Sequence, residues 1–273
     1  FVNLPSTRVL YGEEVRGCVV AKEGTKFVCS DLSAMENIWK FNYQMPYDPE
    51  YVKSQQSEDF DPHLSIALMG GLVTEDEVSF FKIIKEGFPK ENYPQTKRLL
   101  EMLSWDALKQ QGEIKRISKS RAAGKETNYS CQFGAAALTV ARTAKIDLSV
   151  AKTLVKSYKK MNWSIEPICN SLTKKKVSHG TYQLNPMNGM WYHLKKDRDS
   201  FSTLIQGSGS YLLDIWVAYI FNLRNKPEYN VEGGLRLIAT VHDENLQEFN
   251  DLEGNEETVR KLFDDALAMA NKR

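Results

Sequence analysis

The sequence lacks several features that would assign it to other classes of protein. The chain of 273 residues contains no run of about eighteen apolar residues, the length that a membrane-spanning helix needs. Its first residues show no basic segment followed by an apolar stretch and a cleavage site, so no secretion signal is predicted. We therefore expect a cytoplasmic protein with no membrane partner.

Cysteine and histidine are both scarce, and their spacing excludes the common zinc motifs. No Cys-x-x-Cys pair occurs, and no two histidines have the i, i+4 spacing that brings ligands together on a helix. The wide scatter of the cysteines indicates thiols rather than disulfides, in a reducing compartment. The four cysteines are Cys18, Cys29, Cys131 and Cys169.

A strong excess of basic residues is also missing, because the formal net charge is only +1. A diffuse basic surface, which many nucleic-acid-binding proteins carry, is therefore not expected. Local clusters of lysine and arginine do occur, and each alone is explained as a solvated helix face or loop. The clusters comprise Lys156, Lys159 and Lys160, then residues 174–176, then Lys195, Lys196 and Arg198.

Hydrophobic periodicity predicts a mixture of strands and helices, which is the α+β fold class. A strand over 26–29 ends just before Asp31, and strands over 236–241 and 245–249 form a hairpin with a tight turn. Residues 170–200 are polar and are predicted to be irregular. Two amphipathic patches lie over 75–86 and 96–110, and helices are predicted over 33–45, 63–70, 118–141 (with a break near Ser130), 147–162, 210–223 and 256–271.

Two acidic patterns occur where strands end. Asp31 follows the first strand, and Glu36 lies about one helical turn later within Asp-Leu-Ser-Ala-Met-Glu. The second pattern is Val-His-Asp-Glu over residues 241–244, at the turn of the apolar hairpin. Two carboxylates from distant strands can hold two divalent ions about 3.5–4 Å apart, the arrangement used for in-line phosphoryl transfer. These acids are therefore candidate metal ligands.

A third pattern places two cations and an aromatic ring on one face of a predicted helix. Arg121, Lys125 and Tyr129 are spaced at i, i+4 and i+8, which aligns their side chains. Arginine can hold a phosphate through two hydrogen bonds, and lysine adds a compact charge. The stripe suits a triphosphate with a sugar or base at its end.

Each pattern alone has a plainer explanation. An aspartate at a strand end often serves as a turn residue or a helix cap, and a cationic stripe is often a solvated helix face. A His-Asp-Glu turn is an ordinary polar turn in many hairpins. The order of the three patterns along one chain is what favours metal-dependent phosphoryl transfer.

In this order, the motifs resemble those of family A DNA polymerases, the class of bacterial polymerase I and the T7-type phage replicases. Residues 31–36 resemble motif A, residues 121–134 resemble motif B on the fingers helix, and residues 241–244 match motif C. The resemblance implies template-directed DNA synthesis in the cytoplasm of a bacterium or of a phage-infected cell. Shorter matches are Asn3-Leu4-Pro5, Arg16, Asp61-Pro62-His63 and Gln206-Gly207.

The resemblance also implies a polymerase right-hand architecture, with an antiparallel-sheet palm and helical fingers. Residues 1–45 would form the N-terminal part of the palm with motif A, and residues 201–273 its C-terminal part with motif C. Residues 46–200 would form mainly helical fingers, with an insertion around 71–115. The thumb and the exonuclease would be absent from this chain and belong to a separate or removed part.

The resemblance assigns the chemistry to the acidic patterns. Asp31 and Asp243 would bind two Mg²⁺ ions, for which Mn²⁺ could substitute, together with the backbone carbonyl of Leu32. Glu244 would lie beside the metals without binding them directly. Glu36 would act as a steric gate that leaves no space for a ribose 2′-hydroxyl. The implied substrates are a primer–template DNA and deoxynucleoside triphosphates.

The remaining implied roles concern the nucleotide and the DNA. The triphosphate would be bound by Arg121, Lys125 and His63, and Lys125 would also donate a proton to the leaving pyrophosphate. Tyr129 would stack on the incoming nucleotide, with Phe133 near the templating base. The residues that would contact the primer–template near the new base pair are Arg16, Gln206 and His242.

Three departures from the family pattern are present. Ser130 stands where the family usually has glycine, and Pro62 replaces an apolar residue before His63. The interval from Asp31 to Arg121 is longer than is usual, which is why an insertion is predicted.

Two other functions stay open from the sequence. A single-subunit RNA polymerase shares the three motifs, although Glu36 favours a deoxynucleotide substrate. A chain without a thumb could also be a non-catalytic nucleic-acid-binding fragment of a split polymerase, because affinity for DNA depends on the number of phosphate contacts.

Overall fold

The structure, a computed structural model, forms two compact units. It describes residues 10–57, 59–87, 96–241 and 243–272, except for the side chains of Arg16 and Glu86. Unit 1 comprises Phe1–Lys40, Leu184–Tyr192 and Leu204–Arg273, and unit 2 comprises Phe41–Gln183 and His193–Thr203. The predicted palm and fingers boundaries stay predictions.

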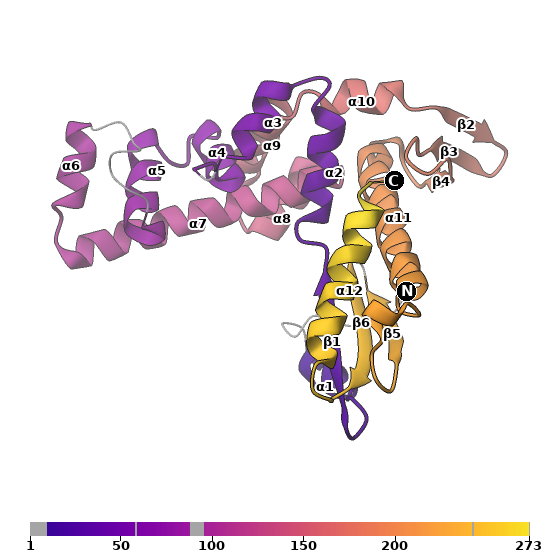
Figure 1. Cartoon of the computed structure of the whole chain (residues 1–273). Helices are drawn as coiled ribbons and strands as arrows, with labels where there is room; N and C mark the ends of the chain where they lie inside the picture. The colour runs from indigo at the N-terminus through magenta and orange to yellow at the C-terminus, as the bar shows by residue number, and fades with distance from the viewer. Residues whose placement is uncertain (1–9, 58, 88–95, 242, 273) are drawn as a thin grey trace. The chain divides into compact units, whose positions relative to one another are not determined.

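Helices predominate along the chain, and the described strands fall into two small sheets (Figure 1). The first half contains α1 (Gly12–Gly17), β1 (Thr25–Asp31), α2 (Met35–Gln44), α3 (Pro49–Gln55), α4 (Pro62–Met69), α5 (Glu75–Phe81), a π-helix (Lys82–Glu86), α6 (Lys97–Leu103) and α7 (Ala107–Gln132). The second half contains α8 (Ala137–Ala144), α9 (Leu148–Met161), α10 (Ile165–Ser171), β2 (Lys174–Val177), β3 (Gly180–Leu184), β4 (Trp191–Leu194), α11 (Ser200–Leu223), β5 (Leu235–Val241), β6 (Glu244–Asn250) and α12 (Asn255–Ala270), with short 3₁₀ turns at Asp197–Asp199 and Pro227–Tyr229.

Unit 1 is built on a sheet of strand order β1-β6-β5, in which both strand pairs are antiparallel. The predicted β5–β6 hairpin is confirmed, with only residues 242 and 243 between its strands. Strand β1 pairs along the other edge of β6. In this register both Asp31 and Val241 lie opposite Glu244, so the ends of all three strands meet at one place.

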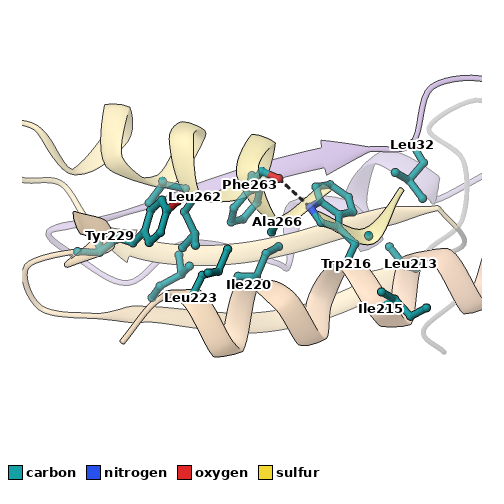
Figure 2. Packing of buried hydrophobic residues seen from close by; sticks show 14 of the residues in the cluster. Leu32, Leu213, Ile215, Trp216, Ile220, Leu223, Tyr229, Leu262, Phe263 and Ala266 are labelled. Carbon is teal, nitrogen blue, oxygen red and sulfur yellow. Dashed lines mark hydrogen bonds between the residues drawn. The ribbon is translucent and has the colours of Figure 1, made fainter. Parts of the chain in front are cut away.

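Helices α11 and α12 supply most of the hydrophobic core of unit 1 (Figure 2). Ile220 and Leu223 of α11 point toward Leu262 and Phe263 of α12. The indole nitrogen of Trp216 donates a hydrogen bond to the Phe263 carbonyl at 2.9 Å, and the two rings meet edge to face. Burying side chains of this size contributes about 1.5–3 kcal/mol each, so this core holds the two helices together.

Helix α11 begins at Ser200, although the sequence predicts a helix only from residue 210. Its first turns are rich in glycine, serine and threonine, which weaken the helical signal. These small residues instead permit close packing, because a Cβ at Gly209 would overlap the thioether of Met35 in α2. The contact ties α11 to the segment that directly follows Asp31.

Several described helices of unit 2 begin at well-formed caps. Asp61 caps α4, Thr74 forms a capping box with Glu77 at α5, and Asp106 caps α7. Segments of the predicted insertion over 71–115 contribute α5 and α6 to a core shared with α4 and α7. The buried residues of this core are Leu64, Ala67, Val73, Phe80, Phe81, Leu99, Met102 and Ile117.

Helices α4 and α7 approach each other closely at Gly124. A Cβ at this position would overlap the backbone carbonyl oxygen of His63, in the first turn of α4. Glycine therefore lets the backbone of α7, a helix of 26 residues, lie directly against α4.

The helix predicted over 118–141 is interrupted just after Ser130. Helix α7 ends at Gln132 and α8 begins at Ala137. Between them, Gly134 has a φ of 71°, and a Cβ there would lie 2.6 Å from the carbonyl oxygen of Arg198. The left-handed backbone and the close approach both require glycine at this break.

The prediction of irregular structure over 170–200 is wrong, because β2, β3 and β4 form a second sheet in this order. The apolar alternation typical of a strand is missing where residues 174–176 are three lysines. Other contacts stabilise the sheet. The side-chain amide of buried Gln183 donates to the Ser200 carbonyl at 3.0 Å, and the rings of Tyr182 and His193 lie 5.2 Å apart.

Among the helices that the structure describes, none has both the length and the apolar character that crossing a membrane would require.

Candidate active site

Asp31 and Asp243 lie side by side at one end of the unit 1 sheet. Asp31 is the last residue of β1, and Asp243 lies in the turn between β5 and β6. The amide of Leu32 donates a hydrogen bond to the Asp243 carbonyl at 3.1 Å, which joins the end of β1 to the turn. The structure therefore brings together the two carboxylates that the acidic motifs single out.

The Asp31 carboxyl is surrounded by negative charge. Burial raises the pKa of Asp31, and the charge of Asp243, a hydrogen bond with the Asp243 side chain and the charge of Glu244 raise it further. Burial and neighbouring negative charge both disfavour the ionised carboxylate. A bound cation would relieve this repulsion.

Glu244 is held beside the carboxylate pair by the register of the sheet. It lies opposite Asp31, and its side chain accepts a hydrogen bond from the thiol of Cys29. Cys29 precedes Asp31 by two positions, so both side chains project from the same face of β1. The Cys29 thiol thus orients the side chain of Glu244, the third acidic residue at this end of the sheet.

The donor atoms at this end of the sheet fit magnesium. The carboxylate oxygens of Asp31 and Asp243 and the carbonyl oxygen of Leu32 are ligands of the kind that Mg²⁺ prefers. Among the described residues, no group of three or more histidine, cysteine, aspartate or glutamate side chains could hold a metal by itself. A metal bound here would therefore need further oxygens from water or from substrate phosphates, which Mg²⁺ normally retains.

The chain turns sharply from β1 into α2. Ala34 has a positive φ of 51°, a conformation that alanine rarely adopts. Glu36 follows in the first turn of α2, while the adjacent Met35 packs against Gly209 of α11. Glu36 is therefore attached to Asp31 by a short segment that is anchored on α11.

Gln206 is exposed within an otherwise buried stretch of α11. Its neighbours Leu204, Ile205, Gly207 and Ser208 are all buried. The amide of glutamine both donates and accepts hydrogen bonds, so this position offers a polar contact to a bound molecule.

In unit 2, the cationic stripe lies on α7, as its spacing requires, and Arg121 is part of an ion pair. The Nε of Arg121 donates to Oδ2 of Asp61 at 2.6 Å. The other carboxylate oxygen of Asp61 accepts hydrogen bonds from backbone amides in the first turn of α4. Asp61 therefore links the stripe to the cap of α4.

His63, Lys125 and Tyr129 form one cluster. The rings of His63 and Tyr129 are 5.8 Å apart between centroids and inclined at 43°. The Nζ of Lys125 lies 5.9 Å from the centroid of the Tyr129 ring, within the range of a cation–π contact. Two elements, α4 and α7, thus present a cation and two rings at the same place.

Pro62 and Ser130, the two substitutions relative to the family pattern, both lie within helices. Pro62 occupies the first position of α4, where a missing amide costs nothing and the fixed φ suits the helix. Ser130 is partly buried on α7. Phe133 directly follows α7, and its side chain is exposed.

Some predicted residues lie outside the described part of the chain. These are residues 3–5, the side chain of Arg16 and the whole of His242. Two partners were not predicted, namely Asp61 for Arg121 and Cys29 for Glu244. The Asp-Pro pair does signal a helix start, but no local pattern connects Asp61 to an arginine 60 positions later.

No protein-family model and no curated protein sequence matches the chain. Among solved structures, it is similar to the POL domain of Pol1 from M. smegmatis, in complex with DNA primer-template and dNTP. The TM-score is 0.57 and the sequence identity is 17%, over 98% of this chain and 41% of that chain. The chain thus has a polymerase-like fold and spans less than half the length of the solved chain.

Proposed function

We propose that the chain is the catalytic part of a family A DNA polymerase and extends a primer along a DNA template. The observation that carries this proposal is the pairing of Asp31 with Asp243 at the sheet end, within a polymerase-like fold. In the reaction, the primer 3′-hydroxyl attacks the α-phosphate of a deoxynucleoside triphosphate and pyrophosphate leaves. Unit 1 then serves as the palm and unit 2 as the fingers.

In this proposal, Asp31 and Asp243 hold two Mg²⁺ ions together with the carbonyl of Leu32, and Mn²⁺ can substitute. Such ions supply Lewis acidity, which lowers the pKa of the attacking hydroxyl and stabilises charge on the leaving phosphates. The raised pKa of Asp31 supports the assignment, because a cation bound between the two carboxylates would offset the burial and the negative charge that raise it. Glu244 adds negative charge beside the pair without acting as a ligand.

The stripe on α7 binds the nucleotide. Arg121, Lys125 and His63 hold the triphosphate, and Lys125 donates a proton to the leaving pyrophosphate. Tyr129 stacks on the sugar and base, for which its exposed ring is suited. Glu36 closes the space that a 2′-hydroxyl would need and thereby selects deoxynucleotides.

The DNA partner is a primer–template, with a thumb and an exonuclease supplied by another part of the polymerase. Gln206 and Arg16 contact the duplex near the new base pair, together with His242. Phe133 lies next to the templating base. The exposed side chains of Gln206 and Phe133 support these contacts.

Primer extension tests the proposal directly. The variants Asp31→Asn and Asp243→Asn each remove one negative charge at nearly constant shape, and each should lower kcat at least about a thousandfold. The rates are measured with primer–template, deoxynucleotides and Mg²⁺, for the chain alone and with a thumb-bearing partner. Asp264→Asn is the matched control, because Asp264 is an exposed aspartate of α12 in the same unit.

Metal binding gives a second readout that does not depend on activity. Titration calorimetry with Mn²⁺ should show binding to the wild type and to Asp264→Asn, and much weaker binding to Asp243→Asn. A wild-type extension rate for Asp243→Asn in the complete assembly would contradict the metal assignment.

Reactions with ribonucleoside triphosphates separate the proposal from a single-subunit RNA polymerase. The wild type should incorporate ribonucleotides much more slowly than deoxynucleotides, and Glu36→Ala should narrow the difference. Equal rates with both substrates in the wild type would instead favour the RNA polymerase. Duplex binding without extension in any assembly would favour the non-catalytic fragment.

A further inference from the structure

A pocket of about 320 Å³ in unit 2 adjoins Arg121, the first cation of the stripe on α7. The described residues that line it are Phe81 of α5, Lys85 of the π-helix, and Ser118 and Arg121 of α7. Lys85 lies in the predicted insertion over 71–115 and in none of the family motifs. Two cations and a hydroxyl group therefore line one hollow, which is named the Lys85 pocket below.

The wall of the pocket that carries Lys85 is fixed on α7. Phe81 is buried in the hydrophobic core that α5 shares with α7. The carboxylate of Glu77 in α5 pairs with Arg116 in α7, with 2.7 Å between Oε1 and Nη2. Because Lys85 follows Phe81 by four positions, the two side chains lie on the same side of this helical segment. The Lys85 pocket thus has a defined shape before any ligand binds.

The π-helix Lys82–Glu86 places Lys85 at the pocket. The amide of Gly87 donates to the Lys82 carbonyl, five positions earlier, which is the hydrogen bond of a π-turn. This hydrogen bond closes one residue later than in an α-helix, so the side chains along the turn are rotated relative to those of α5. Such turns are rare, and they occur frequently at functional sites. The backbone at Lys85 is therefore of a kind that often serves binding.

The Lys85 pocket carries positive charge that no neighbour balances. The Nε of Arg121 donates to Asp61 at 2.6 Å, so the charge of this guanidinium is largely offset. Within the described residues this ion pair engages Nε alone, and both terminal nitrogens keep donors for an anion. Lys85 is exposed, and no described carboxylate forms an ion pair with it. Lys85 therefore supplies the net charge that attracts an anion to Arg121.

We propose that the Lys85 pocket binds the terminal phosphate of the incoming nucleoside triphosphate, with Lys85 and Ser118 as binding residues beside Arg121. This inference rests on the proposed function and extends the nucleotide site to residues outside the family motifs. A terminal phosphate offers three acceptor oxygens and close to two negative charges. The pocket supplies an ammonium, a hydroxyl and a guanidinium group as matching donors.

The spacing of the stripe directs the nucleotide toward this pocket. Eight positions separate Tyr129 from Arg121, which is an axial rise of about 12 Å along α7. A nucleotide whose base stacks on Tyr129 therefore places its phosphates along Lys125 and their far end at Arg121. Ser118 lies three positions before Arg121 on the same face of α7, so it continues the stripe by one turn into the pocket.

Single-turnover primer extension in the complete assembly tests the proposal. Lys85→Gln should raise the apparent dissociation constant of the deoxynucleoside triphosphate about tenfold, because a charge-assisted contact is lost. The maximal extension rate should equal that of the wild type, since this contact is made equally before and during the reaction. Ser118→Ala should weaken binding about threefold. Lys85→Arg should keep most of the affinity, because the positive charge remains.

Inhibition by a deoxynucleoside diphosphate identifies which phosphate Lys85 contacts. The diphosphate lacks the third phosphate, so its inhibition constant should be the same for the wild type and for Lys85→Gln. An equal loss of affinity for the diphosphate and the triphosphate would contradict the assignment to the terminal phosphate.

The variant Lys119→Gln is the matched control for the loss of a positive charge. Lys119 is an exposed lysine of α7, two positions before Arg121, and this spacing directs its side chain away from Arg121. Lys119→Gln should bind the triphosphate like the wild type. Circular dichroism and thermal unfolding establish that each variant is folded. Because Lys85 is exposed, the Tm of Lys85→Gln should not fall.

Calorimetry with inorganic tripolyphosphate gives a readout that does not depend on primer extension. The probe should bind to the wild type and to Lys119→Gln, and more weakly to Lys85→Gln. If Lys85→Gln binds both the nucleotide and tripolyphosphate like the wild type, the inference is wrong. The proposed function survives that result as long as the wild type extends primers. A wild type that extends no primer in any assembly overturns the proposed function, whether or not tripolyphosphate binding depends on Lys85.

Discussion

The two carboxylate oxygens of Asp61 make two different interactions. One oxygen caps α4 and the other pairs with Arg121, the first cation of the stripe on α7. A triphosphate that binds Arg121 must compete with this ion pair. In the proposed function, the affinity for nucleotide would therefore depend on the difference between two interactions of the Arg121 guanidinium, one with Asp61 and one with the triphosphate.

Replacing Asp61 with asparagine separates the capping of α4 from the ion pair with Arg121. Asparagine caps a helix about as well as aspartate, so α4 should remain stable, while the ion pair with Arg121 is lost. We expect Asp61→Asn to bind the incoming deoxynucleotide several-fold more tightly, measured as the nucleotide concentration dependence of single-turnover extension.

The matched control for this prediction is Asp106→Asn. Asp106 caps α7 in the same way, through the amide of Lys109, and has no arginine partner among the described contacts. Weaker nucleotide binding in Asp61→Asn alone would show the opposite role, with Asp61 positioning Arg121 for the phosphates.

Lys40 is a second residue whose environment has a measurable consequence. The side chain is buried in α2, and burial lowers the pKa of Lys40 from 10.5 to about 7. The unfolded chain keeps this proton up to about pH 10.4, whereas the folded protein releases it near pH 7. Burying the charged Lys40 side chain therefore lowers the free energy of unfolding by its full amount below pH 7. This loss of stability becomes smaller as the pH rises toward 10.

The variant Lys40→Met should remove this pH dependence. The stability of Lys40→Met relative to the wild type should be greatest below pH 7 and should fall as the pH rises toward 10. Urea unfolding from about pH 6 to about pH 9 measures the difference. The exposed Lys53 of α3 provides the control Lys53→Met, and an equal, pH-independent effect of both variants would contradict the assignment.

Short-range patterns predicted some contacts between residues and not others. The pairing of Asp31 with Asp243 followed from an acid at a strand end and an acid in a hairpin turn, combined with the order of the motifs. The ion pair between Asp61 and Arg121 could not be predicted, because it depends on how two helices pack. Sequence spacing constrains side chains within one helix, whereas tertiary packing decides which helices meet.

At the scale of elements, the contact between α4 and α7 places the Tyr129 ring of the cationic stripe beside His63. Gly124 lets the two backbones touch, and His63 and Tyr129 then lie within ring contact. The contact between the His63 and Tyr129 rings therefore depends on glycine at position 124, because a side chain there would push the two helices apart.

Two glycines of α7 should respond oppositely to replacement by alanine. A Cβ at Gly124 would overlap the His63 carbonyl, so Gly124→Ala should destabilise the protein by about 1–3 kcal/mol and reduce nucleotide affinity. Gly112 has no neighbour within 4 Å of an added Cβ, so Gly112→Ala should stabilise α7 by about 0.5–1 kcal/mol.

Denaturant unfolding and single-turnover extension measure both effects. Both variants replace glycine with alanine in the same helix. Helix propensity alone therefore predicts that both should stabilise the protein. Stabilisation of both variants would therefore show that α4 and α7 do not pack at Gly124.

Elements with a clear apolar period were predictable, and the others were not. Helices α2, α9 and α12 and the β5–β6 hairpin occur where the periodicity indicates. The first turns of α11 were missed because glycine and serine carry no apolar signal, although they pack tightly. The β2–β4 sheet was missed because its stability comes from a buried amide and from contacts between tilted rings.

At the scale of the whole molecule, the order of the motifs predicted a polymerase-like fold that the structure shares with a solved polymerase domain. The division into units was harder to predict, because neither unit is a continuous segment. Residues 184–192 belong to unit 1 although the segments on both sides belong to unit 2. Hydrophobic periodicity describes local structure only, so it gives no signal that a short segment between two parts of unit 2 belongs to unit 1.

The interleaving of the two units has a consequence for engineering and for recombination between relatives. A chimaera that exchanges residues 41–203 as one block would replace unit 2 and, with it, residues 184–192 of unit 1. Any change in its properties would then be attributed to unit 2 alone, although part of unit 1 had changed as well. A chimaera that exchanges unit 2 alone needs four junctions, at residues 40/41, 183/184, 192/193 and 203/204.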